Sequence, residues 1–507
     1  MKDKSRLLFI FLVPLHMTQA HADTKASLNS FKQGISQVFA PTPTSINTID
    51  LSVLSNVQVD TSRVQELPTV GIPLANQPSV TSSNALVSNP FSVVRPAQTS
   101  VGFTEAIHQA VQRRPEITQS LSQLMAQTAN IDVARAKYYP QISGGLGTAD
   151  LTKGEKGRQL ITLEATQMLY DFGKTKSAVD IEKAKLDQEQ ARVLVNIDDV
   201  AYQVASSIVN IRRYQEIVGI ANEQIQGVSR IAEIADLRAK AGISSQADPI
   251  QAQSNLEAAE SNKIVQETQL LQYYQKLRTL LGYDVSKISW TIPDSVVKRA
   301  ALYDEPEFNQ IPAILVAQSG VEIAKFEKQK SKLTYYPTIN VKGNVSQAIN
   351  GRNPNNNQDD GFYNSIMLEA SSNLYQGGAV GAQTRSASFA EEAAKAQVNA
   401  SYLEVLDQVR LIREEIDNKQ RQMKVLNLRK ETAIRTKELY QEQYKLGTRT
   451  VVDLLNAEQA IHSAAQEIES ARYDIYSAVV QYIQLTGRTR DIYQLNNISI
   501  QGFEIQP

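Results

Sequence analysis

The sequence predicts a mainly α-helical chain with membrane β-strands, built from two tandem copies of one structural unit. Three observations support this fold class. An internal repeat covers most of the chain after residue 103, apolar and polar residues alternate in four segments, and two long helical stretches, 174–241 and 379–446, contain no proline.

The first element is a segment typical of a secretory signal. Residues 1–22 combine a positively charged start, a short apolar run and the sequence Ala20-His21-Ala22, so we expect cleavage after Ala22. The apolar run is well short of the ~20 residues that a membrane-spanning helix needs. Residues 23–100 are rich in Ser, Thr, Asn and Pro, and we expect them to form an extended, disordered segment.

The composition of the chain excludes several classes of function. The net charge of −1 gives no indication of nucleic acid as a partner. The absence of cysteine excludes disulfides, thiolate metal sites and cysteine nucleophiles. Motifs for phosphate binding, dinucleotide binding and serine hydrolysis are missing as well, so we expect no enzyme activity, no cofactor and no bound metal.

The repeat is defined by residues that recur at two constant separations. The anchors of the first copy are Pro115, Tyr138-Tyr139-Pro140, Gly242, Asp248 and Gly282; those of the second are Pro312, Tyr335-Tyr336-Pro337, Gly447, Asp453 and Gly487. The separation is 197 residues up to the strands and 205 residues beyond the Asn-rich segment 350–361. Repeated anchors of this kind indicate two copies of one unit.

The anchors divide the folded chain into four parts. Residues 103–282 form repeat 1 and residues 306–487 form repeat 2. Residues 283–305 lie between the repeats and residues 488–507 follow them. We expect both of these connecting segments to wrap the middle of the long helices.

Each copy is predicted to begin with a helix that leads into two strands. Residues 104–138 are expected to form one helix that Pro140 stops, and Pro337 stops its counterpart. The apolar face of the strands comprises Ile161, Leu163, Ala165, Leu169, Ile339, Val341, Val345, Ile366, Leu368, Ala370 and Leu374. A soluble sheet with one wet face would alternate in the same way. The predicted strand lengths exceed the usual five or six residues and favour membrane-spanning strands.

A very long helix and a returning helix complete each copy. At ~1.5 Å per residue, a helix from Gly173 to Gly242 reaches roughly 100 Å. Its apolar residues follow alternating spacings of four and three with one slip at Ile211, which is the pattern of a coiled coil. Gly242 and Gly447 are expected to form tight turns at the hairpin tips. A solvated cytosolic coiled coil is the alternative, which the predicted export disfavours.

The strands predict an oligomer. Four amphipathic strands are too few for a membrane barrel, which starts at eight strands, and an open edge in lipid would leave backbone groups unpaired. Two chains would give eight strands and a filled interior, whereas three would give twelve and a lumen. We therefore expect a homotrimer whose strands contact outer-membrane lipid.

Three further motifs carry a resemblance. They are Tyr170-Asp-Phe-Gly173, Tyr375-Gln-Gly-Gly378 and Tyr444-Lys-Leu-Gly-Thr-Arg-Thr-Val-Val-Asp-Leu-Leu-Asn-Ala457. With these and the Tyr-Tyr-Pro pairs, residues 103–490 resemble the TolC family of outer-membrane channels, which serve drug efflux and type I protein secretion. The resemblance implies a trimeric 12-stranded β-barrel continuous with a long 12-helix coiled-coil α-barrel, which extends into the periplasm. It also implies a periplasmic adaptor protein and an inner-membrane ABC or RND transporter as partners.

The hairpin tips carry the candidate site. Asp248 and Asp453 begin the returning helices, where a carboxylate suits the positive helix end. Threefold symmetry would place three Asp453 carboxylates around a narrow entrance, which would attract cations. The resemblance implies that Asp248, Tyr444 and Arg449 link neighbouring hairpins and hold this periplasmic gate shut. Asn456 stands where the family has a second acidic ring, a departure that argues against a doubly acidic constriction.

Two other groups of residues are expected to be structural. The segment 350–361, with Asp359 and Asp360, lacks the ligand spacing of a calcium loop, and we expect an extracellular loop. His108 and His462 are far apart in sequence and are expected to be surface or packing residues.

The function expected from the sequence is a passive exit duct of a tripartite export system in the outer membrane. Type I secretion of a protein is favoured slightly, because the N-terminal lipid-bearing cysteine common in dedicated efflux channels is absent. Efflux of drugs or other small molecules is the alternative. A structural or adhesive coiled-coil protein of the cell surface is the alternative from another class.

Overall fold

The computed structural model describes most of the chain after residue 100. It covers residues 101–149, 158–351, 353, 355–359, 361–373, 375–496, 498–500 and 503–504. The chain divides into two units, 1–80 and 81–507, and every described residue belongs to the second unit. The predicted signal with Ala22, the segment 23–100, Asp360 and Leu374 lie outside the described residues.

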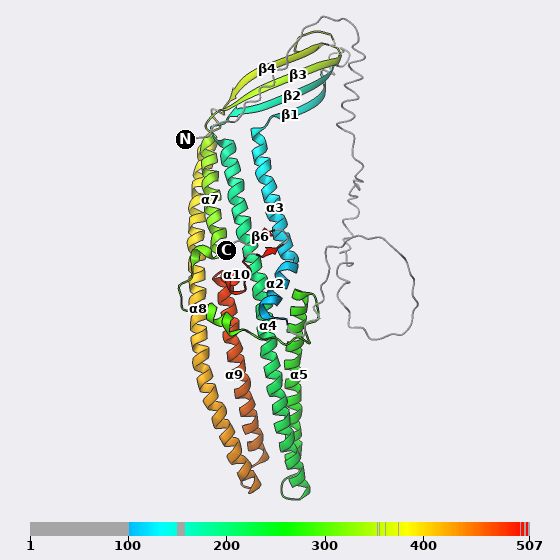
Figure 1. Cartoon of the computed structure of the whole chain (residues 1–507), viewed down its shortest axis with the longest axis vertical. Coiled ribbons are helices and arrows are strands. Elements are labelled where there is room, and N and C mark those ends of the chain that lie inside the picture. Colours follow the sequence, from blue (N-terminus) through cyan, green and yellow to red (C-terminus); the bar gives the residue numbers. More distant parts are fainter. Residues whose placement is uncertain are drawn as a thin grey trace, which may run out of the picture. The chain divides into compact units, whose positions relative to one another are not determined.

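The two halves of the second unit contain the same series of long elements (Figure 1). The first half consists of α2 (Phe103–Arg113), α3 (Pro115–Arg135), the 3₁₀ turn η3 (Ala136–Tyr138), β1 (Gln141–Ala149), β2 (Arg158–Tyr170), α4 (Lys174–Lys240) and α5 (Ala247–Leu281). The second half consists of α6 (Asp294–Arg299), η4 (Phe308–Gln310), α7 (Pro312–Leu333), β3 (Thr338–Asn350), β4 (Phe362–Ser371), α8 (Ala379–Lys445) and α9 (Val451–Leu485). It is followed by α10 (Thr489–Ile492), β5 (Ser499–Ile500) and β6 (Phe503–Glu504). Both α4 and α8 have 67 residues, and both α5 and α9 have 35.

The expected single helix over residues 104–138 is wrong, because the structure has two helices there. Arg114 is extended, with φ −66° and ψ 130°, and Pro115 is the first residue of α3. A proline disfavours helical geometry in the residue before it but suits the first position of a helix. Pro312 begins α7 in the same way. The helix before Pro140 ends as the 3₁₀ turn η3.

The helices form two sets of four neighbours that share α4 and α8. Next to the sheet, α3 packs on α4, α4 on α7, and α7 on α8. Toward the hairpin tips, α5 packs on α4, α4 on α9, and α9 on α8 (Figure 1). Helix α8 is therefore an outer member of both sets, opposite α3 in one and α5 in the other. Within the described part of the chain, no helix has an apolar stretch long enough to cross a bilayer.

The four long strands form one antiparallel sheet in the order β1-β2-β3-β4. The register pairs Ile161 with Leu146 and Leu163 with Val345. It also pairs Val341 with Leu368. Because paired residues lie on the same face, one face of the sheet is apolar and the other carries polar residues such as Glu164 and Lys342.

The pairing of β2 with β3 is interrupted near the end of β2, at Leu169. The register shifts between Met168 and Tyr170, and Tyr170 rather than Leu169 pairs with Ile339. A β-bulge inserts one extra residue into a strand and changes which side chains share a face. Tyr170 therefore lies opposite Ile339, a residue that the sequence places on the apolar face.

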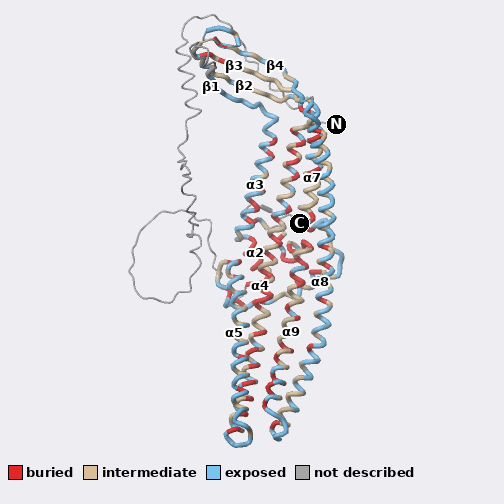
Figure 2. The backbone as a smooth tube through the Cα atoms, turned by 180° about the vertical axis from the view of Figure 1, so that it is seen from behind, coloured by how far each residue is buried: buried red, intermediate tan, exposed pale blue. Residues whose placement is uncertain are grey.

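Two hydrophobic clusters hold the middle and the tips of the helices together, and a small third one, of Ile131, Ala134 and Val179, joins α3 to α4. The main core joins the middle of α4, α8 and α9 to α2 and to both connecting segments; it includes Trp290, Tyr482 and Tyr493, each at most 1% exposed. The tip cluster lies near the hairpin ends and consists of Val228, Ile231, Ala235, Ala252, Tyr444, Val451, Leu454 and Leu455. Buried residues gather along the facing sides of the helices in Figure 2. Complete burial of one such side chain stabilises the fold by roughly 1.5–3 kcal/mol.

Candidate functional site

The two hairpin tips have the same backbone construction. Gly242 and Gly447 have φ angles of +72° and +75°, which favour glycine. The N–H of Ile243 donates to the carbonyl of Arg238 at 2.9 Å, and the N–H of Thr448 donates to the carbonyl of Gln443 at 3.0 Å. These bonds close a Schellman motif at the end of each long helix and reverse the chain.

The returning helices begin differently in the two hairpins. Asp453 forms a capping box with Thr450, in which the Asp453 N–H donates to Thr450 Oγ1 and the Thr450 N–H donates to Asp453 Oδ2. Hydrogen bonds from the Thr450 side chain and backbone lower the pKa of Asp453. Asp248 is the second residue of α5, and Ser245 Oγ accepts from the N–H of Ala247 instead. Asp453 is thus fixed as a carboxylate at its helix start.

Asn456 lies on α9 three residues after Asp453, on the same side of the helix, and is exposed. An amide at this position adds no charge to the one that Asp453 supplies. Each chain therefore presents a single carboxylate on this stretch of α9.

Tyr444 joins the two hairpins within one chain. It is buried on α8, and the guanidinium of Arg238 on α4 lies 4.8 Å from the centre of its ring. Arg238 also donates to the carbonyl of Lys445 at 3.5 Å. Burial raises the pKa of Tyr444, with Arg238 opposing and the nearby Asp248 adding to the rise. The Tyr444 hydroxyl has no hydrogen-bond partner among the described residues.

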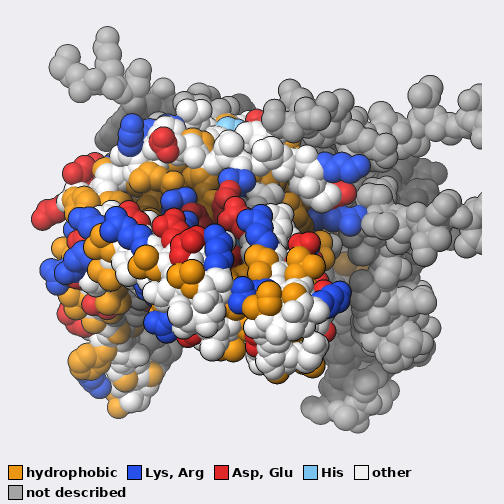
Figure 3. All heavy atoms as spheres, turned by 90° about the horizontal axis from the view of Figure 1, so that it is seen from below, with side chains coloured by type: hydrophobic (Ala, Val, Ile, Leu, Met, Phe, Trp, Pro, Cys, Tyr) orange, Lys and Arg blue, Asp and Glu red, His pale blue; other side chains and the backbone are white. Residues whose placement is uncertain are grey.

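Arg449 makes its contacts within its own hairpin. Its Nε donates to Gln443 Oε1 at 2.9 Å, and its guanidinium lies 4.6 Å from the centre of the Tyr440 ring. Its Nη1 is 3.9 Å from Asp453 Oδ2. The structure therefore brings Tyr444 near Asp248, and Arg449 near Asp453. Side chains of both charges gather at this end of the molecule, with hydrophobic side chains between them (Figure 3).

At the other end of the helices, aromatic side chains surround the junctions with the sheet. Pro140 directly precedes β1 and Pro337 directly precedes β3. Phe172 stacks on Tyr336 with ring centres 5.1 Å apart, and Lys174 Nζ donates to the Tyr336 carbonyl at 2.6 Å. The tyrosines exposed at these junctions are Tyr138, Tyr139, Tyr170, Tyr335, Tyr336 and Tyr375.

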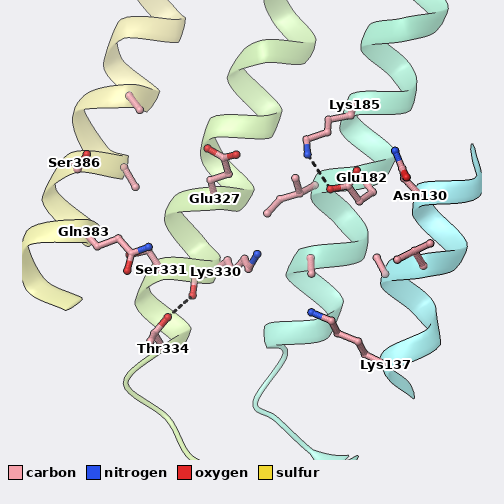
Figure 4. A pocket seen from close by; sticks show the side chains of 16 residues that line it. Asn130, Lys137, Glu182, Lys185, Glu327, Lys330, Ser331, Thr334, Gln383 and Ser386 are labelled. Atoms are coloured by element: carbon pink, nitrogen blue, oxygen red, sulfur yellow. Dashed lines mark hydrogen bonds and ion pairs between the residues drawn. The ribbon is translucent and has the colours of Figure 1, made fainter. Parts of the chain in front are cut away.

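A concavity of about 740 Å³ crosses α3, α4, α7 and α8 near the sheet. Its lining combines the charged residues Lys137, Glu182, Lys185, Glu327 and Lys330 with apolar and uncharged polar side chains (Figure 4). Lys185 Nζ donates to Glu182 Oε1 at 2.8 Å at its edge. The concavity therefore presents side chains of both charges beside apolar surface.

The remaining candidates have structural contacts. His108 Nε2 lies 2.7 Å from the carbonyl oxygen of Tyr493. In the Asn-rich loop, the buried Asn353 side chain donates to the carbonyls of Ser346 and Gly361. Among the described residues, no three His, Asp or Glu side chains are placed to hold a metal ion.

The sequence does not predict the roles of two charged residues near the tips, Arg238 and Glu458. Arg238 looks like a helix-surface cation, and only the fold places it on Tyr444. Glu458 looks like an exposed charge on α9, yet it is 2% exposed and lies against Gly227 of α4. The absence of a side chain at Gly227 is the one sequence feature that relates to this contact, and it lies in another helix.

Comparison with known proteins agrees with this architecture. The family model described as outer membrane efflux protein matches residues 106–283 and 309–488, which correspond to the two halves. Outer membrane protein TolC of Vibrio cholerae is 22% identical over 408 residues, covering 78% of this chain and 93% of that protein. The alkaline protease secretion protein AprF of Pseudomonas aeruginosa is 20% identical over 410 residues, covering 75% and 83%.

The solved structure of the outer membrane protein VceC from Vibrio cholerae has the same fold. Its TM-score is 0.65 at 16% identity, and the match covers 76% of this chain and 96% of that chain. The family consists of channels rather than enzymes, and its members lie in the outer membrane. The chain belongs to the outer membrane efflux protein family of TolC-like channels.

Proposed function

We propose that three copies of this chain form an exit duct through the outer membrane. The observation that carries this proposal is a sheet whose two outer strands, β1 and β4, have no partner on one side among the described residues. Its apolar face is also open: Leu146 is 82% exposed, Ile366 84% and Leu368 70%. Such a sheet needs lipid on that face and a further copy at each edge. Three copies give the 12-stranded β-barrel, with Glu164 and Lys342 facing its lumen.

The helices support the same assembly. Helix α8 is an outer member of both helix sets and exposes apolar side chains, including Phe389 at 74% and Leu428 at 64%. The opposite outer helices, α3 and α5, expose Met125 and Leu271. We propose that α8 of one copy packs on α3 and α5 of the next, which closes the 12-helix α-barrel. The concavity then forms part of its inner wall, and the two repeats 103–282 and 306–487 each supply half of every protomer.

The exposed tyrosines at the junctions between the helices and the sheet support a position for the membrane boundary. Tyrosine is enriched where a membrane protein passes from lipid to water. We propose that the exposed tyrosines from Tyr138 to Tyr375 mark the periplasmic boundary of the lipid. The helices beyond them then extend into the periplasm, and loop 350–361 lies outside the cell.

The hairpin tips are proposed to close the periplasmic end. Asp248, Tyr444 and Arg449 are proposed to link adjacent hairpins, because the Tyr444 hydroxyl has no hydrogen-bond partner in the described part of the chain and lies near Asp248. Three Asp453 carboxylates would ring the entrance, and Asn456 would leave the ring singly acidic. Gly242 and Gly447 keep the tips narrow.

The cargo is proposed to be a protein delivered by an inner-membrane ABC or RND transporter through a periplasmic adaptor. The likeness to AprF, a protein named for protease secretion, supports this direction of export. A deletion strain tests it: we expect a protein to disappear from the culture medium while drug susceptibility changes little. A strain that keeps its secreted proteins but becomes drug-sensitive would favour small-molecule efflux instead.

Cross-linking tests the assembly directly. The chain has no native cysteine, so Asp453→Cys introduces the only thiol. We expect oxidation to yield disulfide-linked chains in purified outer membranes. A cysteine at exposed Leu146, on the lipid side of the sheet, should give none and is the control. Monomers only from Asp453→Cys would contradict convergence of the tips.

A further inference from the structure

A buried carboxylate lies between three helices above the tip cluster. Glu458 of α9 is 2% exposed, and Lys437 Nζ of α8 lies 2.5 Å from its Oε2. His462 Nε2, one turn along α9, lies 3.2 Å from its Oε1 and donates to it. A buried charge with hydrogen-bonded partners of this kind is costly to leave unpaired.

The carboxylate occupies a gap in α4 that a glycine provides. A Cβ added at Gly227 would lie 1.6 Å from Glu458 Oε1 and 2.6 Å from Cδ. Any side chain at position 227 therefore requires the Glu458 carboxylate to shift from this place. Glycine in the interior of a helix destabilises the helix by about 1 kcal/mol relative to alanine. The contact that Glu458 makes in the space at Gly227 offsets this cost.

The contact between α4 and α9 is polar at this level. Gln224 Nε2 of α4 donates to Gln459 Oε1 of α9 at 2.5 Å. Further along, Asp474 of α9 accepts from Arg213 of α4 at 2.6 Å and from Lys419 of α8 at 2.7 Å. Asp474 lies beside the main core, directly after Tyr473, whereas Gln224 and Glu458 lie nearer to the tip cluster; the two clusters share no residue. Apolar side chains such as Ala221 and Ile468 are buried in the same stretch, so the polar contacts add directional links to an interface that is also packed.

We propose that Glu458 is an interlock that holds the α8/α9 hairpin against α4 and so keeps the periplasmic end closed. This inference rests on the proposed function as a gated duct. Because the tip cluster is separate from the main core, the hairpin ends move as a unit once Glu458 leaves the gap at Gly227. Glu458 is a positioning residue: it acts on the entrance through the helices and does not line it.

Single-channel conductance of purified full-length trimers in planar lipid bilayers tests the interlock. Glu458→Gln removes the negative charge and keeps a side chain of nearly the same shape. Gly227→Ala keeps the carboxylate and displaces it with the added methyl group. We expect each to raise conductance several-fold over the wild type. Asp474→Asn is the matched control, since it weakens a similar ion pair beside the main core, and we expect wild-type conductance. Equal conductance of wild type, Glu458→Gln and Gly227→Ala would overturn the proposal, as would equal opening by Asp474→Asn.

Two further comparisons separate an ionic lock from packing alone. The double variant Gly227→Ala/Glu458→Ala restores room for the added methyl group but has no carboxylate, and we expect it to conduct like the open variants. A return to wild-type conductance would show that only packing matters and overturn the lock. Lys437→Met should open the channel and Lys437→Arg should keep it closed; identical behaviour of both would also contradict the ion pair.

The wild type distinguishes this inference from the function on which it rests. If wild-type protein forms neither trimers nor pores, the proposed duct is wrong. If it forms closed trimers that Arg449→Ser opens while every Glu458, Gly227 and Lys437 variant stays closed, the duct stands and the interlock is wrong. If Glu458→Gln yields no trimers, the conductance of Lys437→Met and of Gly227→Ala tests the interlock instead, because both variants disturb the same contact of Glu458.

Discussion

Asp198 is a buried acid whose replacement should stabilise the protein in a pH-dependent way. It lies on α4 and is 3% exposed, and its Oδ1 has no hydrogen-bond partner among the described residues. Burial raises the pKa of Asp198 from 3.8 to about 7, with Arg490 and Thr489 opposing the rise and Asp199 adding to it. Tyr493, also buried, faces the same carboxyl, and its own pKa is raised by burial and by Asp198. The charged form of Asp198 is therefore disfavoured in the folded protein.

The sign and size of the effect follow from the two pKa values. Below pH 3.8 the carboxyl is protonated in the folded and the unfolded chain, and it carries no penalty. As pH rises from 3.8 to about 7 the unfolded chain loses its proton first, so the folded state becomes progressively less stable. At ~1.36 kcal/mol per pH unit, the full penalty above pH 7 is about 4 kcal/mol per chain. At pH 5 it is about 2 kcal/mol.

Asp198→Asn should remove this penalty, because the amide is neutral at every pH. Hydrogen exchange measured by mass spectrometry at the backbone of 489–495 provides the local assay, since Tyr493 donates to Thr489 and Leu495 to Arg490 there. We expect protection to increase by roughly a thousandfold at pH 8 and by about twentyfold at pH 5. Full-length trimers in detergent are used for both proteins, with intrinsic exchange rates corrected for pH.

The control is the neighbouring residue. Asp199→Asn changes an acid that accepts from Gln484 Nε2 at 2.6 Å, and it should weaken this contact without producing the increase in protection. A gain from Asp198→Asn that is equal at pH 5 and pH 8 would refute the reasoning, because charge would then have no part in it. Loss of protection at pH 8 would show that the carboxylate is stabilising.

Three shorter predictions concern the sheet and the tips. Leu368→Lys places a charge on the apolar face, which costs about 2–4 kcal/mol in mid-membrane, and should reduce heat-modifiable trimers in outer-membrane fractions on gels. Arg238→Met removes the cation over the ring of Tyr444, a contact worth about 0.5–2 kcal/mol; conductance in bilayers should rise modestly. Asn456→Asp adds a carboxylate one turn from Asp453 and should increase block of the channel by multivalent cations; unchanged block would contradict a ring at the entrance.

The elements set by local rules could be predicted from the sequence. Helix α4 begins directly after Gly173, and both hairpin turns lie at Gly242 and Gly447. Glycine, proline and strict alternation act over a few residues, so their effects are readable in a single segment. The same rules identify Asp453 as a helix-start carboxylate, although Thr450 of its capping box passes unnoticed.

The parts that depend on distant neighbours could not be predicted. The bulge at Leu169 arises where β2 meets β3, whose residues are far away in sequence. On α4 beyond Ile211, alternating spacings of four and three put Val218 and Ile225 on the predicted coiled-coil seam. Both are only half-buried in the structure, whereas Gln224 is buried. A helix that packs against both α5 and α9 has two seams, and hydrophobic spacing alone selects only one of them.

The separation of the tip cluster from the main core has a consequence for how such a channel works. The main core ties α2 and both connecting segments to the middle of α4 and α9, whereas the tip cluster joins only the ends of the hairpins. Segments with few buried apolar contacts open at lower free energy than the core of the same protein. In the proposed duct, an entrance at the tips would therefore open without unfolding the middle of the helices. The resting state of that duct would then depend on a few contacts, namely Arg238 on Tyr444, Glu458 at Gly227 and the links proposed for Arg449.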